Sequence, residues 1–314
     1  MVTACLTGAS GFIGSHVLKT LASQPGACVR ILSRGARDPA PASPAVRVVV
    51  GDLLDAASLR PFVDRGAVVI NLAYLAGREP GGNRAALENL ARACAAAGVS
   101  RVVHVSTAVV VGRAPDRVVT EATACAPANA YEASKLEGEE ILLRLLRGVC
   151  AVTIVRPTEV FGEGGRGLLK LARGVRHDSP LTAAVKLALS GRRRLNLVYV
   201  GNVAAAIGFL AAIDAPVNGQ RYIVSDDDAP ENNYHDVVQF LRRLWRRPPV
   251  PAVACPPALL RVLLRARGRS NVDPRRTYSA ARLAALGFRE RIPFTTGLAR
   301  FARWYAAQPS ETAA

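Results

Sequence analysis

The chain has 314 residues, of which 50% are hydrophobic and 21% are charged, so it can bury a large core and is not a disordered protein. Lysine and arginine outnumber acidic residues by 41 to 24, which gives a formal net charge of +17. Such a charge attracts polyanions, but no helix-turn-helix, RRM or zinc-finger pattern accompanies it. We therefore expect no nucleic-acid partner.

The sequence also argues against membrane, secreted and metal-binding classes. Its longest apolar runs, such as Val102 to Val111, are shorter than the ~20 residues of a membrane-spanning helix. No basic region precedes the first glycine motif, so a signal peptide is not predicted. The six cysteines show no C-x-x-C spacing, and the four histidines show no ligand spacing. We expect a cytoplasmic protein without a bound metal and without a membrane partner.

Taken in chain order, residues 1–155 alternate short β-branched runs with helical patterns, which is typical of a parallel sheet wound with helices. Strands are predicted at residues 2–6, 28–32, 46–50, 68–72, 101–106 and 152–156, and helices at 13–22, 82–97 and 131–147. Beyond Pro157 the pattern predicts helical pieces at 168–189, a strand at 197–200, a helix at 203–213, a strand at 221–225 and basic C-terminal helices after a proline-rich link.

These elements predict an α/β fold, with a Rossmann doubly wound parallel sheet and a smaller C-terminal α/β substrate-binding domain. The dinucleotide-binding domain is expected over residues 1–160, and part of 195–225 returns to it. Residues 161–314 form the substrate-binding domain, which is interleaved with the first.

A glycine motif, Thr7 to Gly14, directly follows the first strand and opens the first helix with the spacing G-x-x-G-x-x-G. Gly8 permits the tight turn, Gly11 lets a pyrophosphate approach the backbone, and Gly14 lets helix and strand pack closely. The motif predicts dinucleotide binding, with contacts from Gly8, Ser10, Gly11, Phe12, Ile13 and Gly14.

The end of the second strand bears on the choice of cofactor. Ser33 and Arg34 stand where an acidic residue would bind the ribose of NAD, and Arg37 follows. Guanidinium groups suit the extra phosphate of NADP, so NADP is favoured, while NAD stays possible and Arg34 could be one surface arginine among many. After the third strand, Asp52 and Leu53 could contact adenine, although Asp52 could also be a simple helix N-cap.

The catalytic pattern is Tyr131-Glu132-Ala133-Ser134-Lys135, in which Tyr131 and Lys135 share one helix face. An adjacent ammonium is expected to lower the pKa of the phenol toward a range useful for proton transfer. The fifth strand ends in hydroxyls at Ser106 and Thr107, at the edge where a doubly wound sheet binds its ligands. We predict Tyr131, Lys135 and Thr107 as the catalytic residues.

Together these motifs resemble the extended short-chain dehydrogenase/reductase family. The matching segments are Thr7 to Gly14, Gly51 to Leu53, Asn71 to Ala73, Ser106 to Gly112, Glu121 with Pro127, Tyr131 with Lys135, Arg156-Pro157, Val160 to Gly162 and Val198 to Val203. The resemblance implies cofactor contacts from Leu72, Ala73, Tyr131, Lys135 and Pro157. It also implies that Thr107 fills the Ser/Thr position of the family and that the protein forms a homodimer through two helices of each subunit.

Within the family, 4,6-dehydratases carry an Asp-Glu pair after the active-site threonine, whereas this chain has Ala108 and Val109, so a dehydratase is not expected. The chain looks most similar to bacterial nucleotide-sugar 4-ketoreductases. This predicts NADPH-dependent reduction of a nucleotide-activated 4-keto-6-deoxy sugar for surface polysaccharide biosynthesis. The alternatives are a 4-epimerase with tightly bound NAD and a non-catalytic NADP-binding sensor.

The substrate diphosphate is expected to meet arginines of the C-terminal half, and the candidates are Arg194, Arg275 and Arg276. Thr107 would contact the sugar. Two positions depart from the pattern of the family, namely Val111 in place of a tyrosine and Leu195 in place of an arginine. Either departure could indicate a different ketone substrate.

Overall fold

The computed structural model describes residues 3–35, 43–75, 81–251, 256, 258, 261–262, 273–289 and 291–308. Its centre is a seven-stranded parallel sheet with the order β10-β7-β5-β4-β1-β2-β3. The strands are β1 (Ala4–Thr7), β2 (Val29–Ser33), β3 (Val46–Val50), β4 (Val68–Asn71), β5 (Arg101–Val105), β7 (Ala151–Pro157) and β10 (Arg221–Val224). The chain order reverses between β1 and β4, which is where ligands bind in sheets of this type.

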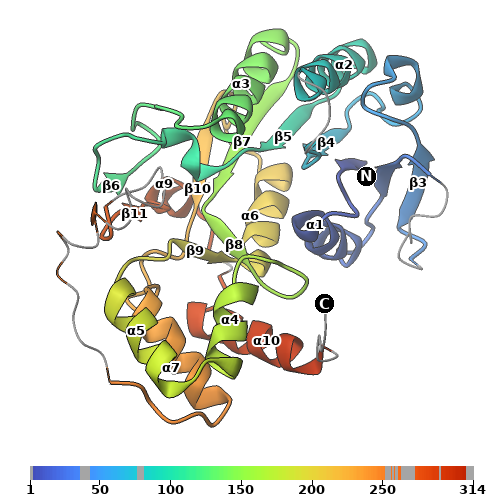
Figure 1. The fold of residues 1–314 in the computed structure, drawn as a ribbon. Coiled ribbons are helices and arrows are strands. Elements are labelled where there is room, and N and C mark those ends of the chain that lie inside the picture. Colours follow the sequence, from blue (N-terminus) through green and yellow to red (C-terminus); the bar gives the residue numbers. More distant parts are fainter. Residues whose placement is uncertain are drawn as a thin grey trace.

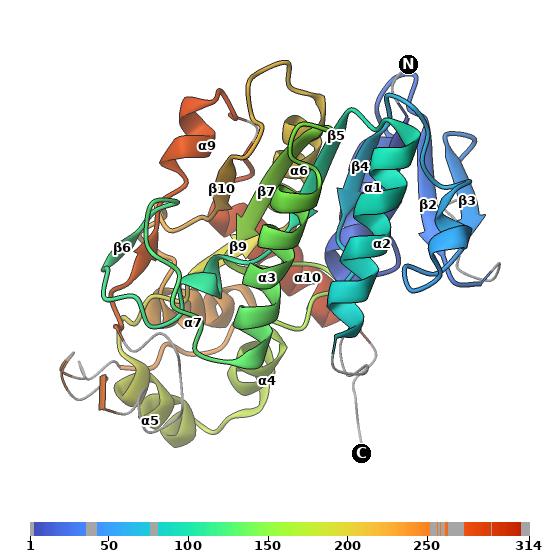
Figure 2. The same ribbon diagram turned by 90° about the horizontal axis from the view of Figure 1, so that it is seen from above.

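Helices cover both faces of the sheet (Figures 1 and 2). On one face α1 (Phe12–Ala22) packs against α6 (Val200–Ala212), and on the other α2 (Gly82–Ala97) packs against α3 (Ala130–Leu145). Neighbouring residues of a strand point to opposite faces of the sheet. Leu6 therefore packs in the core under α1, and Cys5 packs in the core under α2. The predicted doubly wound α/β fold is therefore confirmed.

A second lobe lies below the carboxyl ends of the sheet strands (Figure 1). It contains β8 (Glu159–Phe161), α4 (Leu169–His177), α5 (Pro180–Ser190), β9 (Leu197–Tyr199), α7 (Tyr234–Leu244) and α10 (Phe294–Ala307). Its core is partly aromatic, since Phe161 packs against Tyr199, Phe294 and Phe301. The chain leaves β9 directly into α6 and later adds β10 to the edge of the main sheet, so the two lobes are interleaved.

Short elements complete the described fold. They are the 3-10 turns η1 (Ala56–Leu59) and η2 (Ala108–Val111), the paired strands β6 (Val118–Val119) and β11 (Thr277–Tyr278), and the helix α9 (Ala281–Ala285). Among the residues that the structure describes, no helix is both long enough and apolar enough to cross a bilayer.

Candidate active site

The glycine motif forms a tight cradle at the N-terminus of α1. Gly8 has a φ of +71°, and a Cβ on it would lie 2.8 Å from the backbone nitrogen of Ala73. A Cβ on Gly14 would lie 1.9 Å from the carbonyl oxygen of Gly8, so only glycine lets the helix approach its own turn so closely. Gly11 caps α1 without a side chain, which leaves the amides of the first turn open to an anion.

A depression lies over this cradle, lined by Ser10, Gly11, Phe12, Ser15, Gly164 and Arg166. Ser10 and Phe12 line this depression, as two of the residues for which the sequence predicts cofactor contacts, while Ile13 packs partly into the cores beneath. Arg166, from the loop between β8 and α4, has an exposed side chain and was not predicted from the sequence. Its charge and the dipole of α1 both favour an anion at this point.

The turns after β2 and β3 lie on the other side of the cradle. Arg34 is exposed, and the buried Ser33 donates its hydroxyl to the carbonyl oxygen of Gly35 at 2.6 Å, which shapes the turn that carries Arg34. Arg37 lies outside the described residues. The Asp52 carboxylate accepts the Leu54 amide at 2.9 Å, and Leu53 is buried. Asp52 therefore shapes its own turn, while the cap of the following helical turn η1 is Asp55.

Two side chains join the carboxyl ends of β1 and β4. The Thr7 hydroxyl donates to Asn71 Oδ1 and accepts the Ala73 amide at 3.3 Å. This pair fixes the backbone of Leu72 and Ala73 against the glycine cradle, where the resemblance expects cofactor contacts. Pro157 is buried at the end of β7, in the register of the same sheet.

Tyr131 stands in the first turn of α3, and the start of that helix is fixed by reciprocal capping. Asn129 Oδ1 accepts the Glu132 amide at 2.9 Å, and the buried Glu132 carboxylate accepts the Ala128 amide at 2.6 Å. The Tyr131 side chain is 43% exposed, and the side chain of Thr107, which is 8% exposed, lies close enough to lower the pKa of the Tyr131 phenol. The structure therefore brings the strand hydroxyl and the helix phenol together.

Lys135 lies one turn farther along α3 and is buried. Its Nζ donates to the Val105 carbonyl oxygen at 3.1 Å, and burial lowers its pKa to about 8. Burial, followed by the neighbouring Tyr74, raises the pKa of Tyr131, and the side chain of Thr107 opposes that shift. The lowering expected from an adjacent ammonium does not dominate, because Lys135 is turned toward β5.

The segment of α3 that is C-terminal to Lys135 is anchored by a buried ion pair. Glu139 accepts Arg156 Nε at 2.8 Å and Arg156 Nη2 at 2.6 Å, with exposed fractions of 0% and 2% for the two side chains. Arg221 adds a bond from Nε to Glu139 Oε2 at 3.1 Å. These contacts tie α3 to β7 and β10, so the helix that carries Tyr131 and Lys135 is held rigidly.

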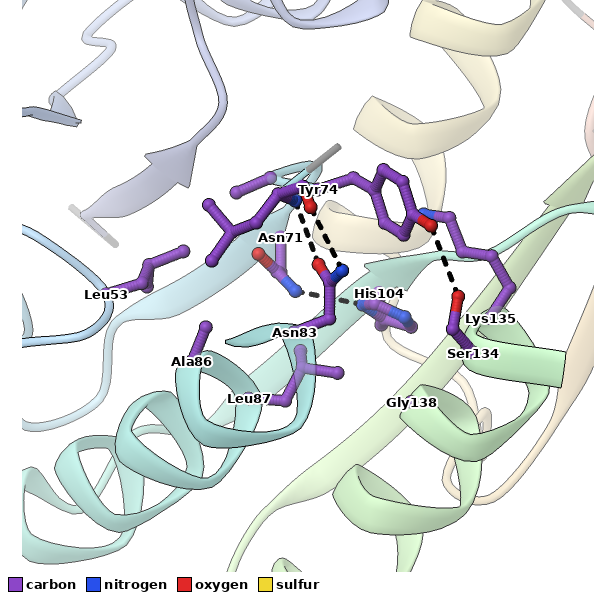
Figure 3. Close-up of a pocket in the computed structure, with 12 residues that line it drawn as sticks. Leu53, Asn71, Tyr74, Asn83, Ala86, Leu87, His104, Ser134, Lys135 and Gly138 are labelled. Carbon is purple, nitrogen blue, oxygen red and sulfur yellow. Dashed lines mark hydrogen bonds between the residues drawn. The ribbon is translucent and has the colours of Figure 1, made fainter. Parts of the chain in front are cut away.

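Tyr74, which follows Ala73 directly, is a member of this site that was not predicted. Figure 3 shows it over a small pocket between β4, α2 and α3, beside Ser134 and Lys135. His104 lies in the wall of the same pocket, where burial lowers its pKa to about 3 and its Nδ1 lies 3.0 Å from Asn71 Nδ2. A neutral His104 with Nδ1 as acceptor carries its proton on Nε2, which is buried and has no partner among the described residues.

The three arginines expected to clamp the substrate have different surroundings. Arg276 is 4% exposed and donates to the carbonyl oxygens of Gly112 and Ala114. Arg194 Nη1 donates to the Ala229 carbonyl oxygen at 2.9 Å, and Arg275 is exposed on the loop before β11. The structure therefore does not gather the three guanidinium groups at one point.

A larger pocket of the second lobe lies between α4, α5 and α7 and reaches Glu159 and Gly167, in the segment that follows β7. Apolar side chains line most of it, and four cationic side chains stand among them: Lys170, Lys186, Arg193 and Arg242. Two carboxylates, Glu159 and Asp178, also line the pocket, and Lys186 Nζ donates to Asp178 Oδ2 at 2.7 Å. Sequence reasoning missed the four cationic residues because they come from three helices and one loop, and only the fold brings them together.

Comparison with known proteins completes the description. Residues 4–225 match the model of the NAD dependent epimerase/dehydratase family. The chain belongs to that family. This match confirms the resemblance drawn from the motifs, and it covers the glycine cradle, the Tyr131 helix and the strands that carry them.

Individual members of the family and individual solved structures share only part of the sequence of this chain. A UDP-glucose 4-epimerase of Azospirillum brasilense is 38% identical over 151 residues, a match that spans 44% of this chain and only 42% of that protein. A UDP-glucuronic acid 4-epimerase of Bacillus cereus in complex with NAD has a TM-score of 0.73 at 17% identity, covering 97% of this chain and 99% of that chain. A Thermus thermophilus UDP-glucose 4-epimerase complex with NAD has a TM-score of 0.70 at 21% identity, covering 98% and 99%. The two structures are similar to this chain in fold.

Proposed function

We propose that the protein is a nicotinamide-dependent oxidoreductase that acts on a nucleotide-activated sugar, with Tyr131 as its proton donor or acceptor. The observation that carries this proposal is the proximity of the Tyr131 phenol to the Thr107 side chain, at the edge of the sheet that also holds the glycine cradle. An exposed phenol beside a buried hydroxyl can hold one carbonyl oxygen between them.

The residues present fit a dinucleotide, because Gly8, Gly11 and Gly14 leave the space that any Cβ would fill. The open amides of α1 and Arg166 would hold the pyrophosphate, and Arg34 would meet an adenosine phosphate. When bound, the nicotinamide ring supplies or takes up the hydride. Lys135 would bind the adjoining ribose hydroxyls from its buried position on α3.

In the proposed reduction, Thr107 and Tyr131 hold the ketone oxygen and orient its carbon for hydride attack. Tyr131 then gives its proton to that oxygen as the alcohol forms, and recovers a proton from solvent through its exposed side. The raised pKa of Tyr131 keeps the phenol protonated at neutral pH, which suits a proton donor better than a proton acceptor.

For the substrate, we propose that the pocket between α4, α5 and α7 takes the nucleotide diphosphate, with Lys170, Lys186 and Arg193 as its cationic contacts. Arg194 and Arg275 remain candidate contacts of the substrate outside the lining of this pocket. The proposed substrate is a 4-keto-6-deoxy sugar reduced by NADPH for surface polysaccharide biosynthesis, in a cytoplasmic homodimer. Arg34 supports NADPH because an acidic residue is missing at that position.

A second candidate is a 4-epimerase with tightly bound NAD, favoured by the partial match to a UDP-glucose 4-epimerase. The two functions differ in whether the cofactor leaves at each cycle. Mass spectrometry of the nucleotide released on denaturing the purified protein separates them: stoichiometric NAD supports the epimerase, whereas protein free of NAD whose Tm rises with NADPH supports the reductase.

The chemistry itself is tested with Tyr131→Phe, with Tyr305→Phe on α10 as a matched phenol deletion away from the site. The assay follows NADPH oxidation with UDP- and dTDP-linked 4-keto-6-deoxy sugars, and conversion of UDP-glucose to UDP-galactose. Tyr131→Phe should lower kcat by about 100-fold or more at unchanged cofactor affinity, and Tyr305→Phe should not. Full turnover by Tyr131→Phe would rule out the proposed proton transfer, and a binding role that survives the change would favour the non-catalytic sensor.

A further inference from the structure

Tyr74 contacts both of the ionisable residues in the proposed catalytic group. Its ring centroid lies 5.4 Å from that of Tyr131, with the two rings 85° apart. Lys135 Nζ lies 4.8 Å from the centroid of the same Tyr74 ring, and the Tyr74 hydroxyl lies 3.3 Å from Ser134 Oγ. Figure 3 shows the ring laid along the Lys135 side chain, with the hydroxyl turned to Ser134. One side chain from the loop after β4 thus spans the active turn of α3.

The loop that carries Tyr74 is held from both sides. The Leu75 amide donates to Asn83 Oδ1 at 2.8 Å, and Asn83 Nδ2 returns a bond to the Leu75 carbonyl oxygen at 3.3 Å, which ties the loop to the start of α2. On the other side the Ala73 amide is bonded to Thr7. Since both neighbours are fixed, the position of Tyr74 is set by the backbone and not only by its own contacts.

Each contact has a physical effect on the group it reaches. The face of an aromatic ring carries partial negative charge, so it stabilises the ammonium of Lys135. The edge-to-face contact limits rotation of the Tyr131 ring, which keeps its hydroxyl directed at Thr107.

We propose that Tyr74 is a positioning residue of the proposed reaction, which holds the Lys135 ammonium and the Tyr131 ring in their working arrangement. The inference rests on the proposed function for the reaction that these residues serve. Tyr74 itself transfers no proton in this scheme. Because Tyr74 acts through Lys135 and Tyr131, replacing Tyr74 should change the pKa values of these two residues.

The charged and titratable neighbours of Lys135 define what the removal of Tyr74 would do. Burial lowers the pKa of Lys135 to about 8, Glu139 on α3 raises it, and His104 on β5 is a further titratable neighbour, whose own pKa the Lys135 ammonium lowers. Loss of the Tyr74 ring removes a contact that favours the ammonium, so the pKa of Lys135 should fall further, by about half a unit.

Tyr131 faces Tyr74 from the loop, Thr107 from the end of β5, and Glu132 from its own helix. Burial and the electrostatic effect of Tyr74 both raise the pKa of Tyr131, while Thr107 lowers it. Removal of Tyr74 should therefore lower the pKa of Tyr131. A proton donor with a lower pKa loses its proton earlier, so the alkaline limb of the rate profile should move to lower pH.

The test compares Tyr74→Leu, which removes the ring, with Tyr74→Phe, which keeps the ring and removes only the hydroxyl. The tyrosinate absorbance of each variant is titrated with and without the additional change Tyr131→Phe, and the difference isolates Tyr131. This measurement needs no substrate, so it stands even if the proposed reaction is wrong. Steady-state kcat, KM and the pH profile are then measured with the best substrate found.

In Tyr74→Leu the pKa of Tyr131 should fall, kcat should drop about tenfold and the alkaline limb should move with the titration, while the cofactor Kd stays within about threefold. Tyr74→Phe keeps the ring that buries Tyr131 but loses the ionisable hydroxyl, so it should show a smaller fall in the pKa of Tyr131 than Tyr74→Leu and keep kcat within about threefold. An unchanged Tyr131 titration and pH profile in a folded Tyr74→Leu protein would overturn the proposal. A shifted titration in a protein that turns over no nucleotide sugar would support the positioning of Tyr131 and refute the proposed function instead.

Discussion

Removing one partner of the buried ion pair on the far side of Lys135 should cost the protein a large part of its stability. Glu139 is 0% exposed and accepts two bonds from Arg156, which is itself 2% exposed. Glu139→Ala leaves the Arg156 guanidinium buried without its counter-charge, and breaking a buried pair in this way costs about 3–5 kcal/mol. The third partner, Arg221, has 32% of its side chain exposed, so we assign it less than about 1 kcal/mol.

Urea unfolding followed by circular dichroism measures this cost, because the midpoint should fall sharply at a nearly constant slope. The matched control is Glu88→Ala, which removes the partner of Arg92 in a surface pair at 3.4 Å and should cost less than about 1 kcal/mol. The double variant Glu139→Met/Arg156→Met removes both charges and should recover most of the loss. If Glu139→Ala proved no more costly than Glu88→Ala, the reasoning from burial would be refuted.

Three further outcomes are expected. Gly14→Ala should abolish the rise in Tm that NADPH or NAD produces, because its Cβ would lie 1.9 Å from the Gly8 carbonyl oxygen, and a preserved rise would contradict the cradle. Arg34→Ala should weaken NADPH binding about 10- to 100-fold in calorimetric titration and leave NADH unaffected, and an equal loss for both cofactors would exclude a phosphate contact. Lys135→Met should abolish turnover yet raise stability at pH 7 by about 1–3 kcal/mol, because burial lowers the pKa of Lys135 to about 8 and charge is costly there. Since the folded state binds this proton more weakly than the unfolded chain, the advantage of the variant should shrink as pH rises from 8 to 10.5, and a constant advantage would count against the assignment.

The strands of the main sheet are well predicted from the sequence because their local hydrophobic patterns match the secondary structure that the fold adopts there. The predicted ranges 46–50 and 82–97 coincide with β3 and α2, and the other strands of the sheet differ by one or two residues at their ends. Glycine spacing and the four-residue step from Tyr131 to Lys135 are also local features. The meeting of Tyr131 with Thr107 follows from the order of strands, which the motifs indicate.

Residues whose position depends on distant parts of the chain could not be predicted in this way. The helix α7 was not predicted, and its Arg242 is 3% exposed and donates to the Pro248 carbonyl oxygen at 2.7 Å. Arg276 is buried in a similar way against the loop after η2. A long guanidinium side chain can satisfy backbone carbonyls inside the protein, and only tertiary contacts show when it does so.

The residues that hold α3 in place differ from the residues of α3 that we propose as catalytic. Asn129 and Glu132 fix the start of the helix, and Glu139 fixes its middle through Arg156, so the backbone between them is held without help from Tyr131 or Lys135. The two proposed catalytic groups can therefore carry unfavourable features, a partly exposed phenol and a buried ammonium, while stability is supplied one turn away. Because the rigid supports and the strained groups are different residues, substitutions at Glu139 should act on stability first, and substitutions at Tyr131 should act on turnover alone.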